Sequence, residues 1–372
     1  MTRFNLRTFY LSAALVAASL TAASTTIEAK DDGTTITLAV FGDWPYSQFL
    51  LDNGNLLTNS VNSDPSINWV VHVGDIHSGS QPCTSAGILP PIQTSNPGWN
   101  QSVFFQFQQF HAPMVYTPGD NEWADCHKVK QLSAGAPLKE LSAVRSLFFS
   151  KPGHTLGGTD ALVWSQSKYF DPDFPTDAQY VENVMWKEKR VVFATFNLPG
   201  GSNNDDPTAA PWTAPFTDIP AQTTEQANRG AANLHWLESA FATAEQAPRA
   251  KAVVLLLQAD MWDPAALPAP GLDKYTPFVA KVAELALKFK GPVLLINGDT
   301  HLYFTDKPLA DPNSATGKIH NTPAVPNLTR IVVQGSTNDP GEWLRLTVDP
   351  TKANPFSWTN VIYCATPSKT KC

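Results

Sequence analysis

The chain has 372 residues, of which 42% are hydrophobic and 16% are charged. This length is enough for a full hydrophobic core without help from metals or disulfides, and the apolar share excludes a disordered or fibrous protein. The formal net charge is −7. A protein that binds duplex nucleic acid normally carries a positive excess, so the charge argues against that class of partner.

The first 29 residues have the pattern of a secretory signal peptide. Arg3 and Arg7 precede a short apolar run at 9–18, and small residues follow at 21–24. The apolar run is too short to span a bilayer, and no later stretch reaches the ~20 apolar residues of a membrane helix. We therefore expect an exported protein, either periplasmic or secreted, without a membrane span.

Short apolar runs that end in a turn recur along the chain and predict buried strands. Apolar residues at three- and four-residue spacing between these runs predict helices. In chain order, the predicted strands are 35–41, 67–73, 113–116, 252–257 and 292–296, and the predicted helices are 102–111, 138–149, 225–247 and 275–289. This alternation predicts an α/β fold with covered sheets. Further strands at 191–197, 329–334, 343–348 and 358–363 predict a second, partly antiparallel sheet, and 203–222 and 306–326 are predicted as long loops.

Four of the five strands that lead into a turn end at a Gly-Asp pair: Gly42-Asp43, Gly74-Asp75, Gly119-Asp120 and Gly298-Asp299. A single pair is readily explained as a turn cap. The carboxyl ends of strands meet at one edge of an α/β sheet, however, and several converging carboxylates repel one another unless a cation lies between them. Four such pairs in this order therefore predict a divalent metal centre.

The order of these blocks resembles the calcineurin-like metallophosphoesterases, the superfamily that includes the purple acid phosphatases. The blocks of that family run Asp-x-His, Gly-Asp, Gly-Asn-His-Glu/Asp, a lone His after a strand, and Gly-His-x-His. The matching segments here are Gly42-Asp43-Trp44-Pro45, Gly74-Asp75, Gly119-Asp120-Asn121-Glu122, Gln258 and Gly298-Asp299-Thr300-His301. The resemblance implies a two-sheet sandwich flanked by helices over residues 30–349, followed by a C-terminal strand and tail at 350–372.

By this analogy, Asp43, Asp75 and His301 hold one metal ion, and Asp75 bridges to a second. The second ion would be held by Asp120, Gln258 and Asp299. This set departs from the family pattern because Pro45, Gln258 and Asp299 stand where histidines are usual, and Asp120 replaces an asparagine. Hard oxygen ligands favour Mn²⁺ or Mg²⁺, with Fe and Zn as alternatives.

The third block also lacks its histidine, which in the family helps to orient and protonate the phosphate. Asn121 stands in its place and can donate a hydrogen bond but no proton near neutral pH. His77 and His127, each close to a predicted ligand in the sequence, are the candidates for a substitute proton donor. For each of them, an ordinary loop histidine is the competing and more common interpretation.

The four cysteines form an even set, which in an exported protein favours disulfides. Sequence alone leaves three pairings open. The resembled fold would place Cys83 and Cys126 in loops at the same edge of adjacent strands, so we expect Cys83–Cys126 at the rim of the site and Cys364–Cys372 as a staple in the tail.

The resemblance implies a metal-dependent phosphoric ester hydrolase in which a metal-bound hydroxide at a binuclear centre attacks a small-molecule phosphoester, and the pattern of residues 1–29 implies that it is exported. The missing histidines motivate an alternative, a non-catalytic secreted protein that keeps the fold and binds a metal or ligand. A structural Ca²⁺ site is a third hypothesis. The substrate, the metal and the oligomeric state stay open.

Overall fold

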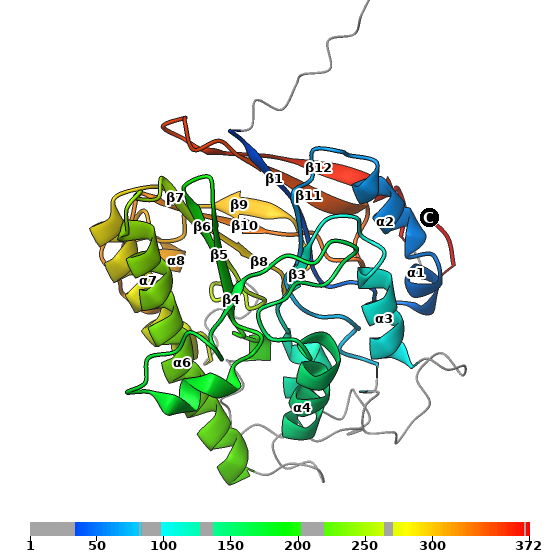
Figure 1. The fold of residues 1–372 in the computed structure, drawn as a ribbon, viewed down its shortest axis with the longest axis horizontal. Coiled ribbons are helices and arrows are strands. Elements are labelled where there is room, and N and C mark those ends of the chain that lie inside the picture. The colour runs from blue at the N-terminus through cyan, green and yellow to red at the C-terminus, as the bar shows by residue number, and fades with distance from the viewer. Residues whose placement is uncertain are drawn as a thin grey trace, which may run out of the picture. The chain divides into compact units, whose positions relative to one another are not determined.

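The computed structural model describes residues 34–81, 83, 98–126, 137–201, 219–263, 271–367 and 370–372. These residues form two mixed β-sheets with helices on their outer faces (Figure 1). The predicted α/β class with two sheets is therefore confirmed. The predicted signal peptide at 1–29 lies outside the described residues.

The first sheet has the strand order β12-β11-β1-β2-β3. Strands β1, β2 and β3 are parallel to one another and come from consecutive apolar runs. Strand β11 pairs antiparallel with β1, and β12 pairs antiparallel with β11. The strand bounds are β1 Ile36–Phe41, β2 Trp69–His72, β3 Met114–Tyr116, β11 Gly341–Val348 and β12 Phe356–Cys364. The helices near this sheet are α1 Gln48–Asp52, α2 Asn55–Asn62, α3 Trp99–Phe107 and α4 Pro137–Phe148.

The second sheet has the strand order β4-β5-β6-β7-β8-β10-β9, with a parallel centre from β6 to β10. Its strands are β4 Trp164–Ser165, β5 Val184–Glu188, β6 Val191–Thr195, β7 Ala252–Leu256, β8 Val293–Asn297, β9 Phe304–Asp306 and β10 Leu328–Val332. The helices associated with it are α6 Ile219–Glu245, α7 Thr276–Phe289 and α8 Ala315–His320.

Three hydrophobic clusters hold these layers together. One lies between the sheets and combines Val71 and Leu346 of the first sheet with Phe193 and Ile296 of the second. The other two lie on the outer faces, where α6 and α7 cover the second sheet and α2, α3 and α4 cover the first. Because both faces of the central strands are buried, their apolar runs are nearly continuous in the sequence.

The predicted assignment of late strands to one second sheet was wrong. β6 and β10 do belong to the second sheet, but β11 and β12 extend the first sheet beside β1. Strand patterning shows burial and not the partner strand, so the return of the chain to β1 was not predictable from it. The predicted loop at 306–326 also contains α8, and α6 begins at Ile219, inside the predicted loop at 203–222.

Within the described part of the chain, no helix combines the length and apolar character needed to cross a bilayer. The two disulfides, Cys83–Cys126 and Cys364–Cys372, have the predicted pairing. They are consistent with an extracytoplasmic location, because disulfides persist in oxidising compartments. The boundary between 349 and 350 stays a prediction.

Candidate metal centre

The predicted ligands follow strands of both sheets. Asp43 follows β1, Asp75 follows β2, and Asp120 follows β3 at the start of a short π-helix, η1 Asp120–Ala124. Gln258 follows β7, and Asp299 and His301 follow β8. Since parallel strands of both sheets end at this edge, the chain brings together side chains that are far apart in the sequence.

The turns that carry these side chains have an unusual backbone. Asp43, Asp75, Asp299 and His301 have φ angles of 50°, 63°, 74° and 67°, in the left-handed region. That region costs an L-residue with a side chain roughly 1–2 kcal/mol. Of the four glycines in the Gly-Asp pairs, only Gly74 has a positive φ. The aspartates themselves therefore make the tight turns, and strain of this kind is concentrated at functional sites.

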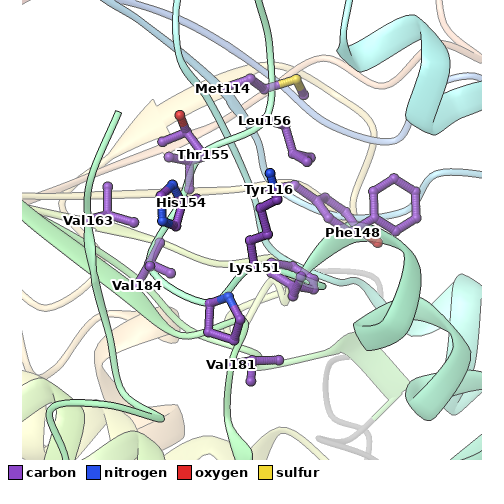
Figure 2. Close-up of a pocket in the computed structure, with 14 residues that line it drawn as sticks. Met114, Tyr116, Phe148, Lys151, His154, Thr155, Leu156, Val163, Val181 and Val184 are labelled. Carbon is purple, nitrogen blue, oxygen red and sulfur yellow. The ribbon is translucent and has the colours of Figure 1, made fainter. Parts of the chain in front are cut away.

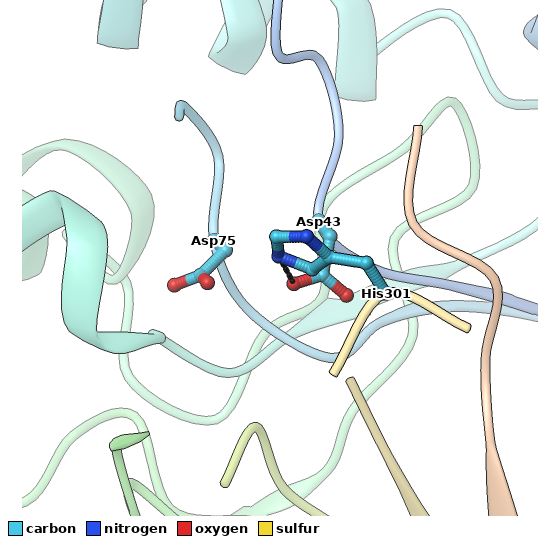
Figure 3. Close-up of side chains that lie close together, drawn as sticks. All are labelled: Asp43, Asp75 and His301. Atoms are coloured by element: carbon cyan, nitrogen blue, oxygen red, sulfur yellow. Dashed lines mark ion pairs between the residues drawn. The ribbon is translucent and has the colours of Figure 1, made fainter. Parts of the chain in front are cut away.

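Asp43, Asp75 and His301 converge (Figure 3). Each offers one ligand atom, and the three atoms lie within 4.8 Å of one another. His301 Nε2 lies 3.2 Å from Asp43 Oδ1. Both aspartates are buried, whereas the imidazole side chain is 30% exposed, so the group is accessible from the side of His301.

Tyr46 is a further member of this group that the sequence analysis did not identify. Its hydroxyl lies 3.0 Å from Asp75 Oδ2, 3.2 Å from Asp43 Oδ1 and 3.3 Å from His301 Nε2. Asn121 Nδ2 donates to the same hydroxyl at 3.0 Å. The phenol oxygen thus lies among all three candidate ligands. The signal in the sequence was its position three residues after Asp43, within the same turn.

Asp120, Gln258 and Asp299 form a second group beside the first. Gln258 Nε2 donates to Asp75 Oδ2 at 3.2 Å and to Asp120 Oδ1 at 3.4 Å. Its Oε1 accepts a hydrogen bond from the backbone N–H of Gly200. Asp299 Oδ2 accepts from the Asp260 N–H at 2.9 Å. Gln258 is thus hydrogen-bonded to Asp120, whereas Asp299 is held separately by the backbone of Asp260.

Burial and mutual repulsion shift the titration of the acidic groups. Desolvation raises the pKa of Asp75 well above its ordinary value, and the charges of Asp120 and Glu122 raise it further. The pKa of Asp299 is raised in the same way, by burial and then by the charge of Asp120. Burial lowers the pKa of His301, but the charge and hydrogen bond of Asp43 outweigh this effect and raise it overall.

The group of Asp43, Asp75 and His301 fits a divalent cation. Asp43 is fully buried, and its Oδ2 has no hydrogen-bond partner among the residues that the structure describes. An unpartnered buried carboxylate oxygen is costly, and a cation would compensate it. Carboxylates with one imidazole form a donor set suited to Mn²⁺, Mg²⁺, Fe or Zn.

The three predicted catalytic residues have different surroundings. Asn121 adjoins the group, where its backbone N–H and Nδ2 donate to Asp75 at 3.1 and 3.0 Å. His77 is buried, its Nδ1 lies 3.1 Å from the carbonyl oxygen of Ser78, and desolvation lowers its pKa to about 4. His127 lies outside the described residues. The catalytic roles of all three stay predictions.

A disulfide supports the turn that carries Asp120 and Asn121. The sulfur atoms of Cys83 and Cys126 lie 3.6 and 3.8 Å from the Asn121 carbonyl oxygen. The bridge joins the chain after β2 to the residues after η1, which is the position expected from the resembled fold. It therefore constrains the rim of the candidate centre.

An ion-pair network behind Asp299 was also not predicted. Arg330 is buried and contacts Asp260 Oδ1, and its guanidinium binds Asp306 through two hydrogen bonds of 2.9 Å. Asp260 in turn donates its backbone N–H to Asp299 and accepts from the Thr300 hydroxyl. The sequence analysis placed Gln258 at the end of a predicted strand. The partner of Asp260 is Arg330 of β10, and no local sequence pattern indicates that these two residues meet.

A separate pocket lies beside β3 and α4 (Figure 2). Most of the residues that line it are apolar, and none of them is a predicted ligand or catalytic residue. The labelled side chains include Met114, Tyr116, Phe148, Lys151, His154 and Val184. It is therefore distinct from the candidate metal centre.

No protein-family model matches the chain, and no curated protein matches it. Among solved structures, it is similar to GAP50, the anchor in the inner membrane complex of Plasmodium, at 8% identity and a TM-score of 0.43, with 91% of each chain covered. It is also similar to the phosphopantetheinyl hydrolase PptH from Mycobacterium tuberculosis, at 13% identity and a TM-score of 0.34, with 82% of this chain and 91% of that chain covered. Both are proteins of the calcineurin-like metallophosphoesterase fold.

Proposed function

We propose that the chain is a metal-dependent hydrolase of small-molecule phosphoesters. The observation that carries this proposal is the convergence of Asp43, Asp75 and His301 within 4.8 Å, with a buried, unpartnered carboxylate oxygen on Asp43. The order of the motifs along the chain supports the same reaction class. A divalent ion bound there would offset the charge of the carboxylates and stabilise negative charge on a phosphoryl oxygen.

The chain's own residues would orient this group. Tyr46 contacts both aspartates and His301 through its hydroxyl, and Asn121 donates to both Tyr46 and Asp75. These contacts fix the two carboxylates relative to each other. His301 is the partly exposed member of the group, so a substrate would approach from its side.

A second candidate function is metal or ligand binding without turnover. Asn121 carries no titratable proton, and its Nδ2 donates to Tyr46 and to Asp75. His77 is bonded to its own loop at Ser78 and is held neutral by burial. Among the described residues, neither Asn121 nor His77 is thus suited to protonate a leaving group, as the histidine of the family pattern would. This favours the binding function.

The test measures metal content and hydrolysis on the same preparations. The full chain is purified from an oxidising compartment without chelator, together with Asp75→Asn and with Asp160→Asn as a control at an exposed aspartate. We expect Mn²⁺-dependent hydrolysis of p-nitrophenyl phosphate or its diester by the wild type and the control. Asp75→Asn should lose both the metal and the activity.

Metal binding without hydrolysis of either ester would support the binding function instead. Full metal content and activity in Asp75→Asn would refute both. We also propose that the chain is exported, on the pattern of residues 1–29 and the two disulfides. Cleavage near residue 29 on secretion, read by N-terminal sequencing, tests that proposal.

A further inference from the structure

We propose that the centre holds a single divalent cation, and that the amide of Gln258 takes the place of a second one. This inference rests on the metal site of the proposed function and concerns the number of ions in it. Asp43, Asp75 and His301 would hold the ion. Gln258 would act as a hydrogen-bond donor to the neighbouring carboxylates and not as a metal ligand.

The orientation of the Gln258 amide carries the first step. Only its oxygen can ligate a metal ion, because the NH₂ group has no free lone pair for that purpose. The backbone N–H of Gly200 is a donor and requires an acceptor, and Gln258 Oε1 is that acceptor. Turning the amide over would place two donors against each other, so Gly200 fixes which end faces the acidic residues.

The opposite end of the amide points at the two acidic residues that would have to share a second ion. Gln258 Nε2 lies 3.2 Å from Asp75 Oδ2 and 3.4 Å from Asp120 Oδ1. Its two N–H groups carry partial positive charge and satisfy these carboxylates. A cation between Asp75 and Asp120 would face the same N–H groups and be repelled by them.

The ligands that remain when Gln258 is not one of them carry the second step. In the described part of the chain, the ligand atoms of Asp43, Asp75 and His301 meet within 4.8 Å, and no such group of three histidine, cysteine, aspartate or glutamate side chains contains Asp120 or Asp299. Asp299 Oδ2 is instead occupied by the Asp260 N–H at 2.9 Å. Without Gln258 as a ligand, the second set therefore lacks a third ligand atom that meets those of Asp120 and Asp299.

The experiment counts bound ions by native mass spectrometry on the full chain with its disulfides intact, titrated with Mn²⁺ alone. The wild type should bind one ion, and Gln258→Ala should also bind one, because no ligand is removed. Gln258→His places an imidazole where the amide is and should bind two. Gln109→His adds an imidazole at an exposed glutamine and should bind one.

Two ions on the wild type would overturn the single-cation inference and leave the proposed function standing. No ion on the wild type would overturn both. A folded Gln258→His variant with one ion would overturn the role assigned to Gln258. Thermal melting confirms that each variant is folded, and the wild-type count decides the number of ions even if the histidine variant does not fold.

Discussion

Replacing His72 with glutamine tests how the two ligand-bearing turns of the first sheet are held together. His72 ends β2, three residues before Asp75, and is fully buried among Phe41, Phe107 and Tyr116. Its Nδ1 accepts a hydrogen bond from the Gly74 N–H, so the ring proton is on Nε2, which donates to the Trp44 carbonyl. The neutral ring thus links the turn after β1 to the turn after β2.

Protonation of this ring opposes folding. Burial lowers the pKa of His72 from 6.5 to about 4. A group whose pKa is depressed in the folded state contributes stability above its unfolded pKa, and that stability is lost as the pH falls from 6.5 towards 4. At 1.36 kcal/mol for each unit, the shift corresponds to a loss of about 3 kcal/mol. A protonated Nδ1 would also be a donor facing the Gly74 N–H.

The assay is urea unfolding of the wild type and His72→Gln at a series of pH values between 4 and 8. Glutamine does not titrate, so the variant should lack the contribution of His72. Other groups shift with pH as well, and the quantity compared is the difference in unfolding free energy between the two proteins at each pH. That difference should shrink by about 3 kcal/mol between pH 7 and pH 4.

His111→Gln is the matched control, because the side chain of His111 is exposed in the segment that follows α3. The variant at His72 should be less stable than the wild type at pH 8, since it loses the aromatic contacts. Parallel pH profiles for the wild type and His72→Gln would refute the reasoning, whatever their separation, because His72 would then contribute nothing to the pH dependence.

Three further predictions concern the ion and the cross-links. The first concerns the protein in EDTA: because the pKa values of Asp75 and Asp299 are raised in the folded state, their contribution to stability is present below pH 3.8 and is lost as the pH rises through those raised pKa values. The urea midpoint should therefore fall with rising pH and recover in excess Mn²⁺. Equal pH profiles with and without Mn²⁺ would contradict this. The second concerns the disulfides: replacing Cys83 and Cys126 together by serine opens a loop with a sequence separation of 43 and should lower the unfolding free energy by about 4 kcal/mol in the loop-entropy model. Replacing Cys364 and Cys372, which are separated by 8, should lower it by about 2–3 kcal/mol. The third uses the same two double variants. The Mn²⁺ affinity measured by calorimetry should weaken when Cys83 and Cys126 are replaced, because their sulfur atoms adjoin the Asn121 carbonyl, and should stay unchanged when Cys364 and Cys372 are replaced. An equal effect of both replacements would show that the Cys83–Cys126 disulfide does not hold the rim of the centre.

The edge of the sheets at which the site lies was predictable because each of its turns is encoded locally. An apolar run followed by Gly-Asp specifies a buried strand and a turn, and parallel strands necessarily end on the same side. Asp43 and Asp75 follow from this pattern, whereas His301 was expected only from the resemblance to a known family. No contact between them had to be known in advance.

The remaining members depend on contacts that no local pattern encodes. Gln258 was predicted as a ligand by position, but its orientation depends on Gly200, which reaches it from the segment after β6. Asp260 depends on Arg330 of β10. Tyr46 was overlooked because its closeness to Asp43 in the sequence does not show that its hydroxyl also reaches Asp75 and His301. The sheet assignment of β11 failed for the same reason, since pairing with β1 is a property of the whole chain.

The position of Asp43 and Asp75 on one sheet and His301 on the other has a consequence for unfolding kinetics. An ion bound by all three would act as a reversible cross-link between the sheets, closing a loop far longer than either disulfide does. Separation of the layers would require its release, so the unfolding rate would depend on the free cation concentration around the protein. The lifetime of the native chain would then be set by the ionic composition of its compartment.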